Sequence, residues 1–130
     1  MSTPVVLTDD GLRFVTDRHL ATLSTIGPDS SIHVVAVGFT FVDGIVRIIT
    51  GDGGQKVRNI ERDERATVAQ VDGARWLSIA GAGVIERGAD EVAHAVALYT
   101  GRYRQPRPNP RRVVIRIVAE KVLGSAGLRA

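Results

Sequence analysis

The hydrophobic residues of this chain recur mostly at every second position, in a series of short segments. Such alternation is typical of β-strands that turn one face toward a core. It predicts six strands, over residues 19–26, 31–42, 45–50, 66–72, 75–86 and 111–124. Asp43 and Gly44, between the second and third strands, predict a tight hairpin, because both turn positions must tolerate a positive φ.

Three other segments carry helix signals. Thr8 is a candidate N-cap, and two aspartates follow it in the first turn. A short helix is expected from near Gln55 to about Arg62, and residues 89–104 have a helical period that ends before three alternating prolines. Six strands in hairpins with helices at the corners predict a mainly β, six-stranded antiparallel barrel, formed by one domain over residues 1–130.

The second predicted strand is apolar on both faces. Ile32, Val34 and Ala36 share one face, while Val35 and Val37 lie on the other, followed by two phenylalanines. An antiparallel strand with one face in water should alternate between polar and apolar residues. We therefore expect a homodimer in which a second copy covers the outside of the barrel.

Composition narrows the chemistry that the side chains can perform. The chain has no cysteine, which excludes disulfides, thiolate metal sites and thiol nucleophiles. His19, His33 and His94 lack the spacing of metal ligands, so we expect no metal site, and no serine has the sequence context of a hydrolase nucleophile. An enzyme built from this chain would use a bound cofactor. The first residues have neither a basic start nor a long apolar run, so we expect a cytoplasmic location.

Arginine is concentrated in one segment, although the net charge is only +3. Residues 102–116 carry no acidic residue and contain Arg102, Arg104, Arg107, Arg111, Arg112 and Arg116. A cluster of like charges predicts an anionic partner. The alternative is a basic face that is simply solvated.

The segment "TGDGGQKVRN", residues 50–59, places three glycines before a lysine at the start of the second predicted helix. The first N–H groups of a helix have no intrahelical acceptor, and Lys56 lies where the helix dipole disfavours a cation. A bound phosphate would satisfy both. Alternatively, Asp52 caps the helix and Lys56 is solvated, and the segment alone does not decide between the two hypotheses.

The segments "HVVAVGFTF", "GGQK", "QVDGARWLS", "RYRQPRPNPRRVVI" and "VLGSA" resemble a known family over nearly the whole chain. It is the split β-barrel flavin and deazaflavin oxidoreductases, relatives of pyridoxamine 5′-phosphate oxidase. The resemblance is strongest to the actinobacterial subgroup that uses coenzyme F420 and includes a biliverdin reductase.

The resemblance implies a dimer with two cofactor clefts, each built from both subunits. It places the tricyclic ring of the cofactor at Val35, Ala36, Val37, Ile49 and Thr50, and the cofactor phosphate at Gly54, Gln55, Lys56 and Asn59. Some relatives have an arginine at the position of Gly54, so phosphate binding here would rest more on the backbone and Lys56. Arg104, Arg107 and Arg111 are the candidate substrate-binding residues, suited to an anionic small molecule.

The implied activity is hydride transfer from reduced deazaflavin to a conjugated acceptor, with reduction of biliverdin to bilirubin as the specific hypothesis. An FMN-dependent oxidoreductase of the pyridoxamine 5′-phosphate oxidase type is the alternative, because the same turn would hold the phosphate of FMN. Hypotheses of another class are a non-catalytic cofactor carrier and a basic barrel that binds nucleic acid. The aromatic content is only 5%, with no stacking platform on one strand, which disfavours nucleic acid as a partner.

Overall fold

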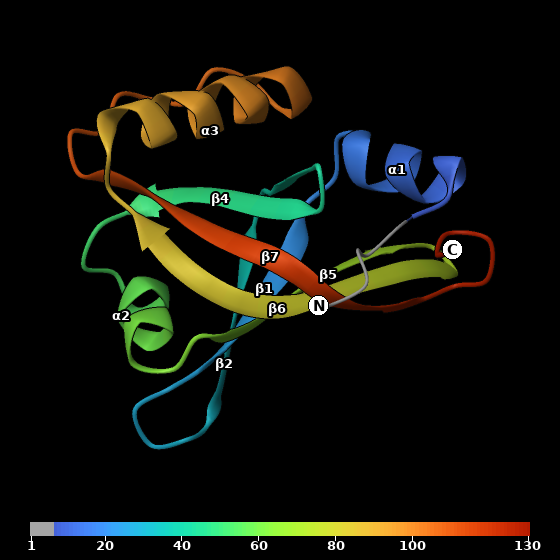
Figure 1. The fold of residues 1–130 in the computed structure, drawn as a ribbon, viewed down its shortest axis with the longest axis horizontal. Helices are drawn as coiled ribbons and strands as arrows, with labels where there is room; N and C mark the ends of the chain where they lie inside the picture. Colours follow the sequence, from blue (N-terminus) through green and yellow to red (C-terminus); the bar gives the residue numbers. More distant parts are fainter. Residues whose placement is uncertain (1–6) are drawn as a thin grey trace.

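The strands of this protein form one antiparallel sheet (Figure 1). The computed structural model describes residues 7–130, so the first residues of the predicted domain lie outside the described range. Within that range the sheet has seven strands in the order β2-β1-β5-β6-β7-β4-β3. Their bounds are β1 (Ala21–Ile26), β2 (Ile32–Val37), β3 (Thr40–Val42), β4 (Ile45–Gly51), β5 (Arg65–Asp72), β6 (Arg75–Glu86) and β7 (Arg112–Gly124). The predicted antiparallel architecture is confirmed.

The prediction of a single second strand is wrong, because the segment breaks after Val37 into β2 and β3. A Cβ atom at Gly38 would lie 3.1 Å from the ring of Tyr103, so the backbone there passes close beneath an aromatic side chain. The N–H of Phe39 donates to the hydroxyl of Tyr103 (3.1 Å), and its carbonyl accepts from Arg102 (2.5 Å). These bonds satisfy the backbone groups of Phe39, which lie between the two strands. After the break the chain continues as β3, which lies at the opposite edge of the sheet from β2.

The break leaves the barrel open. The two edge strands of the sheet, β2 and β3, are consecutive in the chain and are joined at Gly38. Among the described residues, β2 forms hydrogen bonds with β1 and with no other strand. Strand β4 pairs with β3 and β7, and no ladder joins it to β2 in the described residues. The fold is therefore a split barrel, with an unpaired gap between β2 and β4.

The predicted turns are present. Asp43 and Gly44 both have positive φ, 53° and 75°, as the hairpin between β3 and β4 requires. The long strand β6 bends at a bulge between Ala80 and Gly81. A Cβ atom at Gly81 would lie 2.0 Å from the carbonyl oxygen of Val118, so this close approach to β7 requires glycine.

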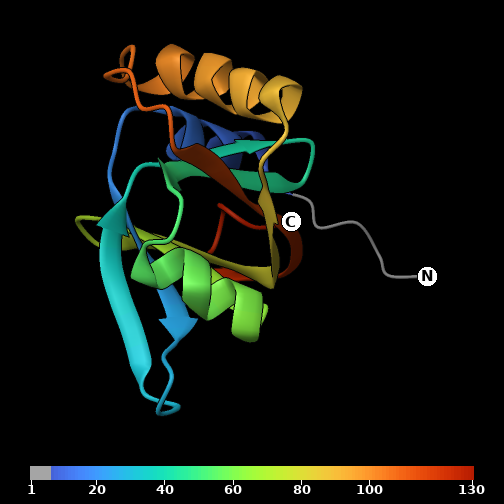
Figure 2. The same cartoon turned by 90° about the vertical axis from the view of Figure 1, so that its left-hand side faces the viewer.

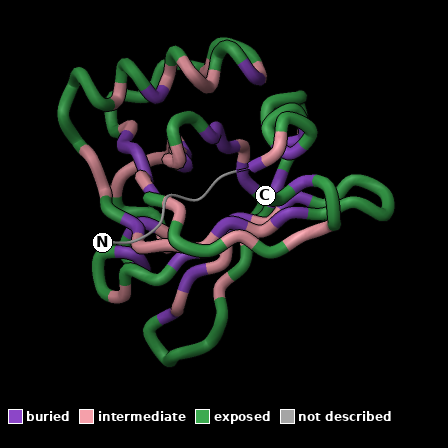
Figure 3. Tube along the Cα trace, turned by 45° about the vertical axis from the view of Figure 1, so that its right-hand side comes forward, coloured by how far each residue is buried: buried purple, intermediate pink, exposed green. Residues whose placement is uncertain are grey.

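Three helices flank the sheet in the described part of the chain: α1 (Asp9–Thr16), α2 (Gln55–Arg62) and α3 (Ala89–Arg102). Thr8 caps α1 as predicted, with its hydroxyl oxygen accepting from the N–H of Gly11 (3.0 Å). Helix α2 packs on β6 and β1, and α3 covers β4, β7 and β3 at the other end of the barrel (Figure 2). Most of α3 is exposed or half-buried (Figure 3). The core lies inside the barrel, where Leu23, Val46, Ile115 and Ile117 are completely buried.

Candidate functional site

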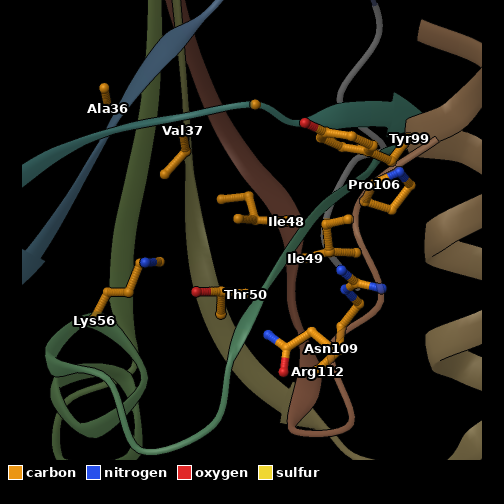
Figure 4. Close-up of a pocket in the computed structure, with 11 residues that line it drawn as sticks. Ala36, Val37, Ile48, Ile49, Thr50, Lys56, Tyr99, Pro106, Asn109 and Arg112 are labelled. Atoms are coloured by element: carbon orange, nitrogen blue, oxygen red, sulfur yellow. The ribbon is translucent and has the colours of Figure 1, made fainter. Parts of the chain in front are cut away.

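A cavity of about 300 Å³ occupies the gap between β2 and β4 (Figure 4). It exists because the two strands are not hydrogen-bonded to each other, so their side chains and backbone face an open space. Strands β2 and β4, helices α2 and α3, and the connector before β7 all contribute to its lining. The lining residues are Ala36, Val37, Gly38, Ile48, Ile49, Thr50, Lys56, Tyr99, Pro106, Asn109 and Arg112.

The cavity has a mixed lining, in which apolar side chains of β2 and β4 lie beside polar groups that include two cationic side chains. Lys56 reaches in from α2 on one side, while Asn109 and Arg112 lie on the other side of Thr50 (Figure 4). No carboxylate belongs to the lining. Such a cavity suits a flat apolar ring that carries a negatively charged group, because apolar side chains bind the ring and cations neutralise the charge.

The start of α2 beside this cavity lacks a capping side chain. Its N-cap is Gly54, no side chain bonds there, and the first turn has no acidic residue. The first helical bond runs from the N–H of Arg58 to the carbonyl of Gly54 (3.0 Å), so the N–H groups of Gln55, Lys56 and Val57 have no acceptor within the helix. A helix start of this kind is suited to an anion.

Asp52 does not cap α2, so the part of the alternative hypothesis that assigned it this role is wrong. Its carboxylate accepts two hydrogen bonds from the guanidinium of Arg87 (2.9 and 3.0 Å) and one from the N–H of Gly53 (2.9 Å). The hydrogen bond from Arg87 lowers the pKa of Asp52. Arg87 thus compensates the one negative charge of the turn, which lowers its repulsion of an anion bound nearby.

The structure brings together five of the nine residues predicted to bind a cofactor. Ala36, Val37, Ile49, Thr50 and Lys56 all line the cavity. The remaining four are Val35, which packs against the hydrophobic core, Gly54 and Gln55 at the start of α2, and Asn59.

Asn59 lies behind the cavity. It is completely buried, and its amide group donates to the hydroxyl of Thr25 (3.1 Å). Its carbonyl oxygen accepts from Gln55 (2.7 Å) and Arg62 (3.2 Å). The polar atoms of Asn59 therefore fix α2 against β1, and the structure does not place this side chain where a ligand in the cavity would contact it.

The three predicted substrate arginines lie in different places. Arg104 lines a second cavity, of about 310 Å³, next to the first. Arg111 lies against the turn before α2, where its guanidinium donates to the carbonyl of Asp52 (3.3 Å). Arg107 is exposed, and its carbonyl accepts from Arg112 (2.5 Å). These arginines do not form one binding surface.

Arg102 corrects the expectation that the basic segment as a whole faces an anionic partner. Its guanidinium is buried and donates to the carbonyls of Asp17 (3.0 Å) and Phe39 (2.5 Å) and to the side-chain oxygen of Gln70 (2.7 Å). Burial lowers the pKa of Arg102. This arginine belongs to the core of the protein.

Sequence reasoning missed Gly38, Tyr99, Pro106 and Asn109 as parts of the site. The signal for Tyr99 was its helical spacing with Tyr103, whose ring centroid lies 4.8 Å away, but that spacing equally fits a core contact. Asn109 stands between two prolines in a connector whose path the sequence does not specify. In residues 7–130 no group of three acidic or histidine side chains could hold a metal ion, and no helix has the length and hydropathy to cross a membrane.

Comparisons with known proteins identify relatives of this chain. Residues 7–126 match the family described as pyridoxamine 5′-phosphate oxidase. An F420H2-dependent biliverdin reductase from Mycobacterium tuberculosis (strain CDC 1551 / Oshkosh) is 52% identical over 130 residues, which cover 98% of this chain and 95% of that protein.

Solved structures show the same fold. The crystal structure of a conserved hypothetical protein from Mycobacterium tuberculosis superposes with a TM-score of 0.80 at 26% identity, covering 95% of this chain and 88% of the other. An F420 reductase superposes with a TM-score of 0.72 at 22% identity, covering 85% and 94%, which is a likeness of fold.

Proposed function

This chain belongs to the pyridoxamine 5′-phosphate oxidase family, and from that premise we propose that it is a coenzyme F420-dependent oxidoreductase that reduces biliverdin to bilirubin. The observation that carries the proposal is the cavity between β2 and β4. It combines apolar side chains with Lys56 and an uncapped helix start, at positions where the family resemblance places a cofactor. The 52% identity to an F420H2-dependent biliverdin reductase supports F420 as the cofactor and biliverdin as the acceptor.

The residues present fit a deazaflavin coenzyme. Ala36, Val37 and Ile49 offer an apolar strip to its ring, and the free N–H groups of α2 with Lys56 offer donors to its phosphate. Among the glycines nearby, Gly54 has only a backbone oxygen within 4 Å of its missing Cβ, at 3.6 Å, so the backbone of this turn is accessible to a ligand. FMN carries a phosphate too, which keeps it as the alternative cofactor.

The bound coenzyme would supply a hydride to the central methine carbon of biliverdin, and one proton would complete the two-electron reduction to bilirubin. The contribution of the protein is alignment and electrostatics. The apolar lining residues would pack against the ring, and Lys56 and Arg112, on opposite sides of Thr50, would each offer a positive charge to an anionic group. No side chain is assigned as proton donor, and solvent serves in this scheme.

Parallel titrations with oxidised F420 and FMN test the cofactor, because both absorb and fluoresce. We expect tight binding of F420 and weaker binding of FMN. Oxidation of F420H2 in the presence of biliverdin, followed by the loss of biliverdin absorbance, then tests the reaction. Tight binding of FMN without binding of F420 would support the alternative oxidoreductase, and binding of F420 without any turnover would indicate a carrier.

The proposed functional unit is a homodimer. The outward face of β2 exposes Ile32 (71%) and Val34 (54%), and the register of the sheet aligns them with outward residues of β1, β5 and β6. Arg65 at the edge of β5 is a charged residue of this face. The other aligned outward residues are uncharged; they are Thr22, Ser24, Ile26, Ile32, Val34, Ala36, Thr67, Ala69, Val71, Trp76, Ser78 and Ala80. A broad face with so little charge is typical of a surface that another subunit covers. Ala36 borders both this face and the cavity, so a second copy would also enclose the cofactor.

Two matched substitutions test the homodimer. Val34→Glu places a charge on this face of low charge, whereas Val84→Glu places one on an equally exposed valine (53%) that lies near Glu61, Arg62 and Arg87. Light scattering should give a dimer mass for the wild type and for Val84→Glu, and a monomer mass for Val34→Glu. A wild-type monomer at micromolar concentration would end the dimer proposal and leave the single-chain cavity as the site.

A further inference from the structure

A second cavity lies directly beside the proposed coenzyme cavity and has a different character. It measures about 310 Å³ and is lined by Arg18, His19, Leu20, Tyr99, Tyr103 and Arg104. Tyr99 belongs to the linings of both cavities, so the two cavities are neighbours. A molecule that reacts with a ring in the first cavity can extend into the second across Tyr99.

The second cavity is held in shape by two consecutive residues at the end of α3. The hydroxyl of Tyr103 donates to the carbonyl of His19 (2.7 Å), and the guanidinium of Arg102 donates to the carbonyl of Asp17 (3.0 Å). Both bonds fix the segment that leads from α1 into β1. Arg18, which lies in this segment, is thereby kept on the same cavity as Arg104.

Both arginines of this cavity have free guanidinium groups. In residues 7–130 neither Arg18 nor Arg104 takes part in an ion pair or donates a side-chain hydrogen bond. No carboxylate belongs to the lining. Two exposed cations on one cavity give it a positive charge that favours an anion, and the planar guanidinium is suited to bidentate contacts with a carboxylate.

We propose that Arg18 and Arg104 bind the carboxylate groups of the electron acceptor, and that the second cavity is therefore the acceptor subsite. The inference rests on the proposed function, because biliverdin carries two propionates and would have to reach the neighbouring coenzyme cavity. It assigns to Arg18 a role in specificity that the sequence pattern did not indicate. It also separates Arg104 from Arg107 and Arg111, which lie elsewhere.

Carboxylates could also come from the coenzyme, whose side chain ends in glutamate residues, so the experiment must separate the two sources. The variants are Arg18→Ala, Arg104→Ala and the double variant. The control is Arg129→Ala, which removes an exposed arginine that lines neither cavity and whose side chain donates to the carbonyl of Gly124 (3.0 Å). Equilibrium binding of biliverdin and of biliverdin dimethyl ester is measured by absorbance, with oxidised F420 present. The affinity for F420 is measured separately by fluorescence.

Each single variant should weaken the binding of biliverdin about two- to fivefold, since contacts of exposed guanidiniums are weak, and the double variant should weaken it roughly tenfold. The dimethyl ester, which lacks both charges, should bind the wild type and the double variant equally. KM for biliverdin should rise with kcat unchanged, the pattern of lost binding shared by ground and transition states. Arg18→Lys should recover part of the affinity.

Three results would overturn the inference. Equal affinity of the wild type for biliverdin and its dimethyl ester would show that carboxylates are not recognised. An equal loss in the Arg129→Ala control would show that the effect is one of net charge. A loss of F420 affinity with unchanged binding of biliverdin would assign the cavity to the coenzyme. Failure of the proposed function is distinct from all three, because the wild type itself would then bind no F420 or fail to reduce biliverdin.

Discussion

Lys56 provides the sharpest test of the proposed coenzyme site. Its side chain lies in the first turn of α2 and lines the cavity between β2 and β4. It has no ion-pair partner among the described residues, and Asp52 at the preceding turn is bound to Arg87. The substitution Lys56→Ala would therefore break no ion pair or side-chain hydrogen bond of the described residues, while it would remove a cation that faces the cavity.

The expected effect on coenzyme binding is large and the expected effect on stability is small. A hydrogen bond to a charged group contributes about 1.5–3 kcal/mol. Because about 1.4 kcal/mol corresponds to a tenfold change in Kd, the affinity for F420 should fall roughly tenfold to a hundredfold. The free energy of unfolding of the apo protein should stay within about 0.5 kcal/mol of the wild type. It can even rise slightly, since a cation leaves the positive end of a helix.

Fluorescence titration with oxidised F420 and urea unfolding of the apo protein together measure both quantities. The matched control is Arg58→Ala, which removes a cation from the same helix whose side chain is exposed and does not line the cavity. We expect Arg58→Ala to change the Kd for F420 by less than about threefold, the scale of an exposed charge. If Lys56→Ala folds normally and binds F420 and FMN as tightly as the wild type does, the phosphate assignment is wrong.

Three further predictions follow from contacts away from the cavity. Arg102→Met removes the donor of three hydrogen bonds, to the carbonyls of Asp17 and Phe39 and to the side-chain oxygen of Gln70. It should lower the free energy of unfolding by roughly 2–4 kcal/mol in urea titrations, whereas a solvated arginine would give almost no change. Gly81→Ala forces a Cβ atom to within 2.0 Å of the carbonyl oxygen of Val118, so it should lower the thermal midpoint strongly, and a wild-type midpoint would refute the close approach of β6 and β7. Hydrogen bonds from Arg65 lower the pKa of Asp63 to about 2, below the ordinary 3.8, so Asp63 stabilises the fold above pH 4 and this stabilisation is lost as the pH falls toward 2. Asp63→Asn should therefore flatten the pH dependence of the thermal midpoint between pH 4 and pH 2, and an unchanged slope would contradict this.

The strands of this protein were predictable because they have one buried face and distinctive turns. Five of the six predicted strands form, with ends that differ by at most two residues. The β3–β4 hairpin was predictable from Asp43 and Gly44, because both residue types tolerate the positive φ that they adopt in the turn. The alternation of apolar and polar residues does not show, however, that the chain passes from one edge of the sheet to the other between β2 and β3. The segment from Ile32 to Val42 keeps its apolar residues through the break, because both halves border the same core.

The break itself depends on contacts that are distant in the sequence. Gly38 can approach the rings of Tyr99 and Tyr103 because it has no side chain. The hydroxyl of Tyr103 accepts a hydrogen bond from the N–H of Phe39. A glycine within an apolar run signals a bend at most. The partner that makes the bend into a break is about 60 residues away, and single-sequence patterns contain no such pairing information.

In the candidate site too, features that follow from local sequence could be predicted, and features that depend on distant contacts could not. The start of α2 near Gln55 and the place of Lys56 in its first turn could be predicted from local rules for helix ends, whereas the absence of a capping side chain was seen only in the structure. The contacts of Asn59 could not be predicted, since its spacing from Lys56 indicates a shared helix face but not whether that face meets a ligand or β1. The structure shows that it meets β1, through the hydroxyl of Thr25.

The arginines of the basic segment explain why composition alone misleads about partners. In the structure Arg102 lies seven residues after the buried Ala95, on the same inward side of α3, which was not predicted from the sequence. A charge at such a position is normally predicted to be exposed, because burial without partners is costly. Here the carbonyls of Asp17 and Phe39 supply the partners, and neither can be foreseen without the tertiary fold. For a cluster of like charges, the tertiary contacts must therefore show which side chains are buried and bonded within the protein before the others are assigned to a ligand.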